Sequence, residues 1–136
     1  MEIDGGCHCG AITYRAEVDP ADASLCHCTD CQTLSGAPFR SMIYTAAERF
    51  ELLSGHPKIY IRTAESGAKR VQAFCPDCGT PLYATAAEPG PGPRKIGIRL
   101  GTVRQRAALK PRRQFWARSA LPWIGDLASI PKIEKQ

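Results

Sequence analysis

Three cysteines within six residues constrain this chain more than any other feature, and they lie in the stretch Cys26-His27-Cys28-Thr29-Asp30-Cys31. Packing of a small domain does not require three thiols so close together, whereas thiolates that converge in this way are typical zinc ligands. The cluster has no obvious fourth ligand, and three protein ligands with one open position are typical of a catalytic zinc site. The spacing therefore predicts an open zinc site on Cys26, Cys28 and Cys31.

A short helix is predicted directly after the second thiol of this cluster. Thr29 and Gln32 have the S/T-x-x-E/Q spacing of a capping box, so the helix should begin near Asp30. Gly36 should end it, because glycine is the common residue just past a helix C-terminus. Cys31 would then lie in the first turn, where free backbone N–H groups and the helix dipole favour a thiolate.

Four further cysteines lie in two tight turns far apart in the chain. Cys7 and Cys9 lie in the glycine-flanked turn GGCHCG, and Cys75 and Cys78 lie in CPDCG. Proline fixes φ and glycine permits a positive φ in the second turn, so backbone N–H groups can point at the sulfurs. Each turn offers two thiols and a closed zinc site needs four, so we expect the two pairs to share a structural zinc. The competing division joins Cys75 and Cys78 to the three-cysteine cluster, which overfills that cluster and leaves the first pair short.

Alternation of apolar and polar residues predicts a mainly β chain. A half-buried strand is expected over residues 12–18, where apolar side chains recur at every second position. Residues 58–62 are expected to return alongside residues 50–53 after a turn at residues 54–57. Further strands are predicted at residues 24–25, 39–44, 69–74, 81–85 and 96–100. The result is a single domain of mostly antiparallel strands joined through metal, onto which Phe115-Trp116 and residues 121–124 are expected to pack.

Length and charge limit the possible classes of protein. The 136 residues suit one domain. The acidic start MEIDGG lacks the apolar segment of a secretory signal, and no apolar run is long enough to cross a membrane, so we expect a cytoplasmic protein with reduced thiols. The formal charge of +5 counts the thiols as neutral, and seven thiolates with two Zn²⁺ ions together contribute −3, which lowers it to +2. This near balance does not favour nucleic acid as a partner.

A zinc ion held by three thiolates carries a formal charge of −1. This charge lowers its Lewis acidity relative to a site of three histidines, so it is less effective at ionising water. It is better suited to hold a fourth, substrate thiolate that stays nucleophilic. The three-cysteine cluster therefore predicts sulfur chemistry, namely the addition of a thiol to a carbonyl group or the reverse cleavage of a carbon–sulfur bond.

The cysteine motifs resemble those of the glutathione-dependent formaldehyde-activating enzyme family, which also includes centromere protein V. The resemblance rests on three segments in order: GCHCG at residues 6–10, CHCTDC at residues 26–31 with Gly36 behind it, and FCPDCGTPL at residues 74–82. It covers about residues 5–85, and Trp116 and Trp123 are similar to the aromatic C-terminal part of family members.

This resemblance implies a zinc-bearing β-tent of stacked antiparallel sheets, with residues 1–136 as one domain. Its C-terminal segment is expected to pack back on the signature region, which is the part at about residues 5–85 that carries the cysteine motifs. It implies a structural zinc and a catalytic zinc, on the ligand sets Cys7/Cys9/Cys75/Cys78 and Cys26/Cys28/Cys31, respectively. The implied activity is that of a carbon–sulfur lyase that forms or cleaves S-hydroxymethylglutathione. Glutathione and a small aldehyde are the partners that follow from this activity.

Several of these candidate residues also have simpler interpretations than a role in catalysis. The three-cysteine cluster could be a second closed site, with His27, His8, His56 or an acidic residue as the fourth ligand. His27 could be a proton shuttle, although such side chains more often face solvent or hydrogen-bond a carbonyl. Arg40 and Arg62 could bind substrate carboxylates, although arginines on strands are mostly solvated.

A basic C-terminal run supports an alternative function. A non-catalytic zinc module could use such a surface to bind protein or nucleic acid, with Phe115 and Trp116 available for stacking. The run consists of Arg104, Arg106, Lys110, Arg112, Arg113 and Arg118. Solvated charge is the simpler interpretation of these residues, and a third possible function is a sensor of glutathione adducts that handles thiols without an aldehyde.

Overall fold

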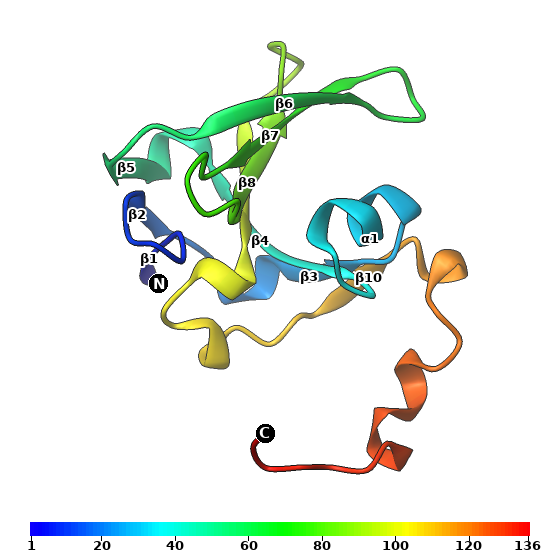
Figure 1. Cartoon of the computed structure of the whole chain (residues 1–136). Coiled ribbons are helices and arrows are strands. Elements are labelled where there is room, and N and C mark those ends of the chain that lie inside the picture. The colour runs from blue at the N-terminus through cyan, green and yellow to red at the C-terminus, as the bar shows by residue number, and fades with distance from the viewer.

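The structure is a computed structural model that describes residues 1–136 and is mainly β, with one α-helix (Figure 1). The helix is α1 (Thr29–Ser35). The strands, in chain order, are β1 (Glu2–Gly6), β2 (Thr13–Glu17), β3 (Ala23–Cys26), β4 (Arg40–Ala46), β5 (Phe50–Ser54), β6 (Lys58–Thr63), β7 (Lys69–Phe74), β8 (Pro81–Ala86), β9 (Lys95–Arg99) and β10 (Arg113–Phe115).

These strands form two sheets. The smaller sheet has the order β1-β2-β5, and the larger has the order β10-β3-β4-β9-β8-β7-β6. All neighbouring strands are antiparallel except β10 and β3, which run parallel. The prediction of a mainly β, single-domain chain with mostly antiparallel strands and one short helix is confirmed.

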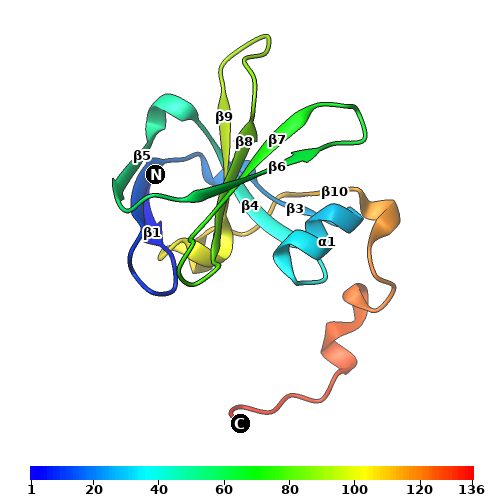
Figure 2. The same ribbon diagram turned by 45° about the horizontal axis from the view of Figure 1, so that its top comes forward.

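Apolar side chains from both sheets form one core between them. Ile3 and Tyr14 come from the smaller sheet, and Ile96 and Ile98 come from β9 of the larger sheet. Successive residues of a strand point to opposite faces, so Arg99 lies on the other side of the larger sheet from these isoleucines. One face of the larger sheet is therefore apolar, and its opposite face is left for polar groups. Helix α1 lies beside β3 and β4 (Figures 1 and 2).

Strands β5 and β6 do not pair with each other, so the predicted return of residues 58–62 alongside residues 50–53 is wrong. β5 pairs with β2 in the smaller sheet, and β6 pairs with β7 at the edge of the larger one. The chain passes between the sheets at Gly55, which has a positive φ of 75° and approaches the Ala11 backbone too closely for a side chain. Ser54 fixes this passage, because its hydroxyl donates to the Ala11 carbonyl.

The C-terminal part of the chain returns to the larger sheet only in β10. Beyond residue 119 the chain leads away from the rest of the molecule (Figures 1 and 2). Trp123, Leu127 and Ile130 are about half exposed, so the expected packing of residues 121–124 on the sheet is not found. This segment forms 3₁₀ turns and has no strand partner. No helix of the chain has both the length and the apolar character that a membrane crossing requires.

We predict that Gly55→Ala lowers the free energy of unfolding by about 3 kcal/mol, because it combines backbone strain with a clash against the Ala11 carbonyl oxygen. Gly67→Ala is the matched control: its φ is 86°, but no atom lies within 4 Å of the added Cβ. Strain alone should cost about 1 kcal/mol there. Urea unfolding of both variants measures the difference, and equal losses would contradict a close passage at Gly55.

Candidate metal centre and active site

Four thiols from two distant turns meet in one cluster. Cys7 and Cys9 follow β1, whereas Cys75 and Cys78 lie between β7 and β8. Their sulfurs lie within 4.8 Å of one another, and none of them forms a disulfide. The Sγ–Sγ distances are 3.5 Å for Cys7 and Cys9 and 3.8 Å for Cys9 and Cys75. A tetrahedron with zinc–sulfur bonds of about 2.3 Å places its sulfurs about 3.8 Å apart, so the donor set and its spacing fit zinc.

The four thiols of this cluster differ in their tendency to ionise. The Thr80 hydroxyl lies 3.1 Å from the Cys78 sulfur, and this hydrogen bond is the largest cause that lowers the pKa of Cys78 to about 5. A backbone hydrogen bond from Ala11 works to lower the pKa of Cys9, but the neighbouring thiols raise it to about 12. Four thiolates this close together repel one another, so a cation is needed to hold all of them in the ionised form.

The second cluster joins Cys26, Cys28 and Cys31, as the sequence predicts. Cys26 ends β3, Cys28 precedes α1, and Cys31 lies buried in its first turn. The three sulfurs lie within 4.8 Å of one another. The predicted capping box is wrong, because the N-cap is Cys28, whose sulfur accepts the Cys31 N–H at 3.3 Å. Gln32 instead donates to the carbonyl of His27 at 2.8 Å.

No histidine, carboxylate or fourth cysteine completes this cluster. His27 is fully buried, and its Nε2 is hydrogen-bonded to the Gln114 amide oxygen at 2.7 Å, so it neither faces solvent nor lies among the ligand atoms. His8 and His56 are exposed. Asp30 forms an ion pair with Arg62 at 2.5 Å. The three thiols are therefore a donor set with one coordination position left for another molecule, which fits a zinc site of the catalytic type.

A cavity of about 440 Å³ opens onto the three thiols. Its walls come from the polar face of the larger sheet, from α1 and from the segment after β10. The walls include Met42, Tyr44, Gln72, Phe115 and Trp116, together with four arginines, Arg40, Arg62, Arg70 and Arg99. Trp116 is the single non-glycine residue with a positive φ, at 54°, and such backbone strain is common at functional sites.

The interpretation of Arg40 and Arg62 as solvated strand residues is wrong, because Arg40 is buried and the Arg62 side chain is only 20% exposed. Arg40 is 6% exposed and Arg99 is 8% exposed. Arg62 and Arg70 are register partners on β6 and β7. The sequence interpretation missed Arg70 and Arg99, although each lies on a strand at a position that alternates with core residues. The alternation of these arginines with core residues was visible in the sequence. It could be interpreted only once the apolar face of the sheet was known.

The pKa values of the three thiols of the open cluster are shifted in different directions. Burial raises the pKa of Cys26 and Cys31, and in Cys31 the charge of Arg40 offsets only part of this effect. Burial also works to raise the pKa of Cys28, but the Cys31 N–H, the neighbouring thiols and Arg62 together lower it. Burial raises the pKa of Tyr44 as well, so its phenol stays protonated at neutral pH.

Two arginines of the basic C-terminal run, Arg104 and Arg113, are paired with carboxylates of the chain. Arg104 forms an ion pair with Asp4, and Arg113 forms one with Asp22 at 3.4 Å. Trp116 lines the three-cysteine cavity. The cations of the run thus have different surroundings, and part of their charge is neutralised within the chain.

Comparison with known proteins agrees with these motifs. A family model described as the glutathione-dependent formaldehyde-activating enzyme matches residues 2–119. The chain belongs to this family. The resemblance seen in the cysteine motifs is thereby confirmed, and the match extends beyond them to include β10 and Trp116.

One protein similar in sequence and one similar in structure can be compared with this member of the formaldehyde-activating enzyme family. A protein of Schizosaccharomyces pombe named as an uncharacterized lyase is 32% identical over 82 residues, which cover 60% of this chain and 56% of that protein. The match thus spans little more than half of that relative's length. The crystal structure of a Rhodobacter sphaeroides protein is similar in fold, with a TM-score of 0.60 and 18% identity, covering 82% of this chain and 98% of that one.

We predict that metal binding by the three-cysteine cluster weakens as the pH falls. The raised pKa values of Cys26 and Cys31 keep both thiols protonated near neutral pH, and a metal ion must displace these protons. Two displaced protons lower the affinity by up to about a hundredfold per pH unit. Proton release on zinc loading, compared with that of Cys28→Ser, isolates the contribution of this cluster. Equal proton release by the two proteins would contradict the prediction.

Proposed function

We propose that this protein is a zinc-dependent carbon–sulfur lyase or synthase that acts on adducts of glutathione with a small aldehyde, of the S-hydroxymethylglutathione type. The observation that carries this proposal is the three-cysteine cluster, whose sulfurs converge at an arginine-lined cavity without a fourth protein ligand. Membership of the formaldehyde-activating enzyme family and the likeness to a lyase support it.

Two zinc ions per chain suit the two cysteine sets. The set of Cys7, Cys9, Cys75 and Cys78 has four sulfur donors and joins distant segments, which suits a structural ion. Cys26, Cys28 and Cys31 would hold the catalytic ion. A zinc ion bound by three thiolates leaves a position for an incoming thiol and favours its nucleophilic thiolate form.

The charge of the cavity suits glutathione. A glutathione molecule held through its sulfur presents two carboxylates and one ammonium group to the surrounding walls. Four guanidinium groups line the cavity, and of these only Arg62 has a carboxylate partner within the chain. Arg62 and Arg70 lie together on β6 and β7, whereas Arg40 and Arg99 lie on β4 and β9. The pair of Arg62 and Arg70 can donate paired hydrogen bonds to one carboxylate of glutathione, which leaves Arg40 and Arg99 for the reacting oxygen.

The reaction needs a proton donor at the aldehyde oxygen. In the synthase direction the sulfur bonds to the carbonyl carbon, the carbon–oxygen π bond opens, and the oxygen takes up a proton to become a hydroxyl group. The lyase direction breaks the carbon–sulfur bond and returns this proton. Tyr44 supplies a protonated hydroxyl in the cavity, and the buried charges of Arg40 and Arg99 would stabilise the developing oxyanion.

We predict that Cys28→Ser abolishes catalysis and lowers the zinc content from two ions per chain to one, because the four-cysteine set keeps its own ligands. Tyr44→Phe should retain both ions and lower the catalysed rate by at least about tenfold. Exchange NMR of the formaldehyde–glutathione equilibrium measures the rate, and elemental analysis measures the zinc. The uncatalysed exchange in buffer is the baseline. A wild-type rate equal to this baseline would exclude the proposed reaction.

We predict that Arg70→Gln raises the KM for glutathione by about tenfold and changes kcat much less, because one charge-assisted hydrogen bond to a carboxylate is lost. Arg49→Gln is the matched control, since Arg49 is an exposed arginine outside the cavity. A thiol without carboxylates, such as 2-mercaptoethanol, should react equally well with wild type and Arg70→Gln. If Arg70→Gln impairs both thiols to the same degree, carboxylate recognition by Arg70 is wrong.

A further inference from the structure

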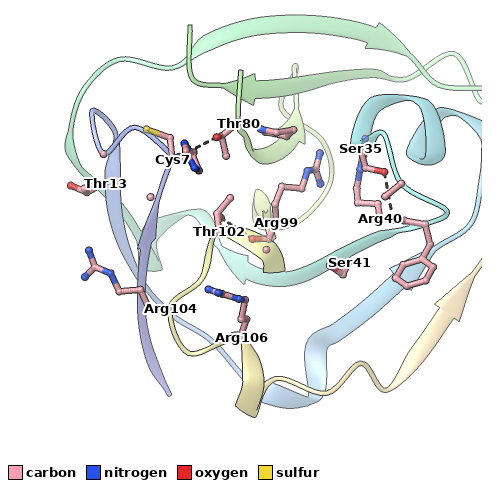
Figure 3. A pocket seen from close by; sticks show the side chains of 17 residues that line it. Cys7, Thr13, Ser35, Arg40, Ser41, Thr80, Arg99, Thr102, Arg104 and Arg106 are labelled. Carbon is pink, nitrogen blue, oxygen red and sulfur yellow. Dashed lines mark hydrogen bonds between the residues drawn. The ribbon is translucent and has the colours of Figure 1, made fainter. Parts of the chain in front are cut away.

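A second cavity of about 580 Å³ lies between the four-cysteine cluster and the ends of β4 and β9 (Figure 3). It shares only Arg40 and Arg99 with the three-cysteine cavity. Its lining contains no aspartate or glutamate but includes two more arginines, Arg104 and Arg106. The proposed lyase reaction uses Arg40 and Arg99 but does not account for the rest of this cavity or for Arg104 and Arg106.

Two guanidinium groups in the wall of this cavity, those of Arg40 and Arg99, are buried without a carboxylate partner. The Nε atoms of Arg40 and Arg99 have no hydrogen-bond partner, and the one side chain that Arg99 contacts by hydrogen bond is the neutral Gln72, at 2.8 Å. None of the five ion pairs in the chain includes either residue. Figure 3 shows the Arg99 side chain extending into the space between Thr80 and Ser35. Burying a cation without a carboxylate partner is unfavourable, and an anion bound here would offset part of this cost.

The edge of the cavity adds a further cation. Arg104 is engaged with Asp4, but Arg106 has no carboxylate partner and donates only to the Val103 carbonyl at 3.1 Å. Arg106 does not line the three-cysteine cavity, so a ligand bound at the three thiols does not neutralise it. Ser41 lines the second cavity but not the three-cysteine cavity, and it adds a hydroxyl group there.

We propose that this second cavity binds a small anion through a phosphate or carboxylate group held by Arg40, Arg99 and Arg106. Planar guanidinium groups recognise both kinds of oxyanion by paired hydrogen bonds, and burial strengthens these bonds. The volume is in the range of cavities that hold metabolite-sized molecules. The site shares Arg40 and Arg99 with the three-cysteine cavity, but Arg106 and Ser41 belong to it alone, and it does not depend on the proposed lyase activity.

Calorimetric titration of the zinc-loaded full chain with sodium phosphate, and separately with sodium succinate, tests this proposal at constant ionic strength against sodium chloride. We expect saturable binding that Arg106→Gln weakens by about tenfold. Arg70→Gln is the matched control, because Arg70 lines only the three-cysteine cavity, and it should leave this binding within about twofold. Stronger binding of phosphate or of succinate identifies the group that the site prefers.

Amide NMR shifts locate the anion without relying on a variant. Perturbation of Ser41, Gly101 and Thr102, which line only the second cavity, is the expected result. The proposal is overturned if neither anion binds saturably. It is also overturned if the shifts are confined to Ser66 and Ala68 of the other cavity and Arg70→Gln, rather than Arg106→Gln, weakens binding. Neither thiol nor aldehyde is present, so failure here leaves the lyase proposal untouched.

Discussion

The convergence of sulfur atoms from distant turns is the constraint on which the rest of the structure depends. Cys7 follows β1 of the smaller sheet, and Cys75 follows β7 of the larger sheet, so the four-cysteine cluster joins the two sheets at one end of their shared core. The opposed pKa values of Cys78 and Cys9 show that the thiols do not ionise together unaided. A cation that holds all four would cross-link segments almost 70 residues apart, which removes much of the freedom of the unfolded chain.

The two faces of the larger sheet differ in chemical character, since one is apolar and the other carries arginines. Its apolar face packs on the smaller sheet through residues such as Ile98, while the opposite face carries Arg99 beside the three-cysteine cavity. Strand alternation alone produces this division, since neighbouring residues of one strand point in opposite directions. The charged groups are thus fixed on a rigid β scaffold, and the guanidinium groups of Arg40 and Arg99 stay in place although they lack carboxylate partners.

Sequence periodicity predicted most strands close to their observed bounds, and it failed where the local signal was weak. β1 was not predicted because it ends in Gly5 and Gly6, and β10 was not predicted because its three residues lie in a basic run. The pairing of residues 50–53 with residues 58–62 was wrong, because the passage of the chain between sheets at Gly55 resembles a turn in sequence. Strand propensity is a local property, whereas the choice of partner strand depends on the whole fold.

The sequence by itself determined which cysteines converge within each turn, because two thiols two or three residues apart can reach one point whatever surrounds them. The fold decided that Cys7 and Cys9 meet Cys75 and Cys78. Only the tertiary structure decided that no fourth side chain joins Cys26, Cys28 and Cys31, since this depended on where His27 and Asp30 found their partners. The arginine-lined cavities were likewise decided by the fold. The guanidinium groups of the three-cysteine cavity come from strands far apart in the chain, and only sheet order and register bring them together.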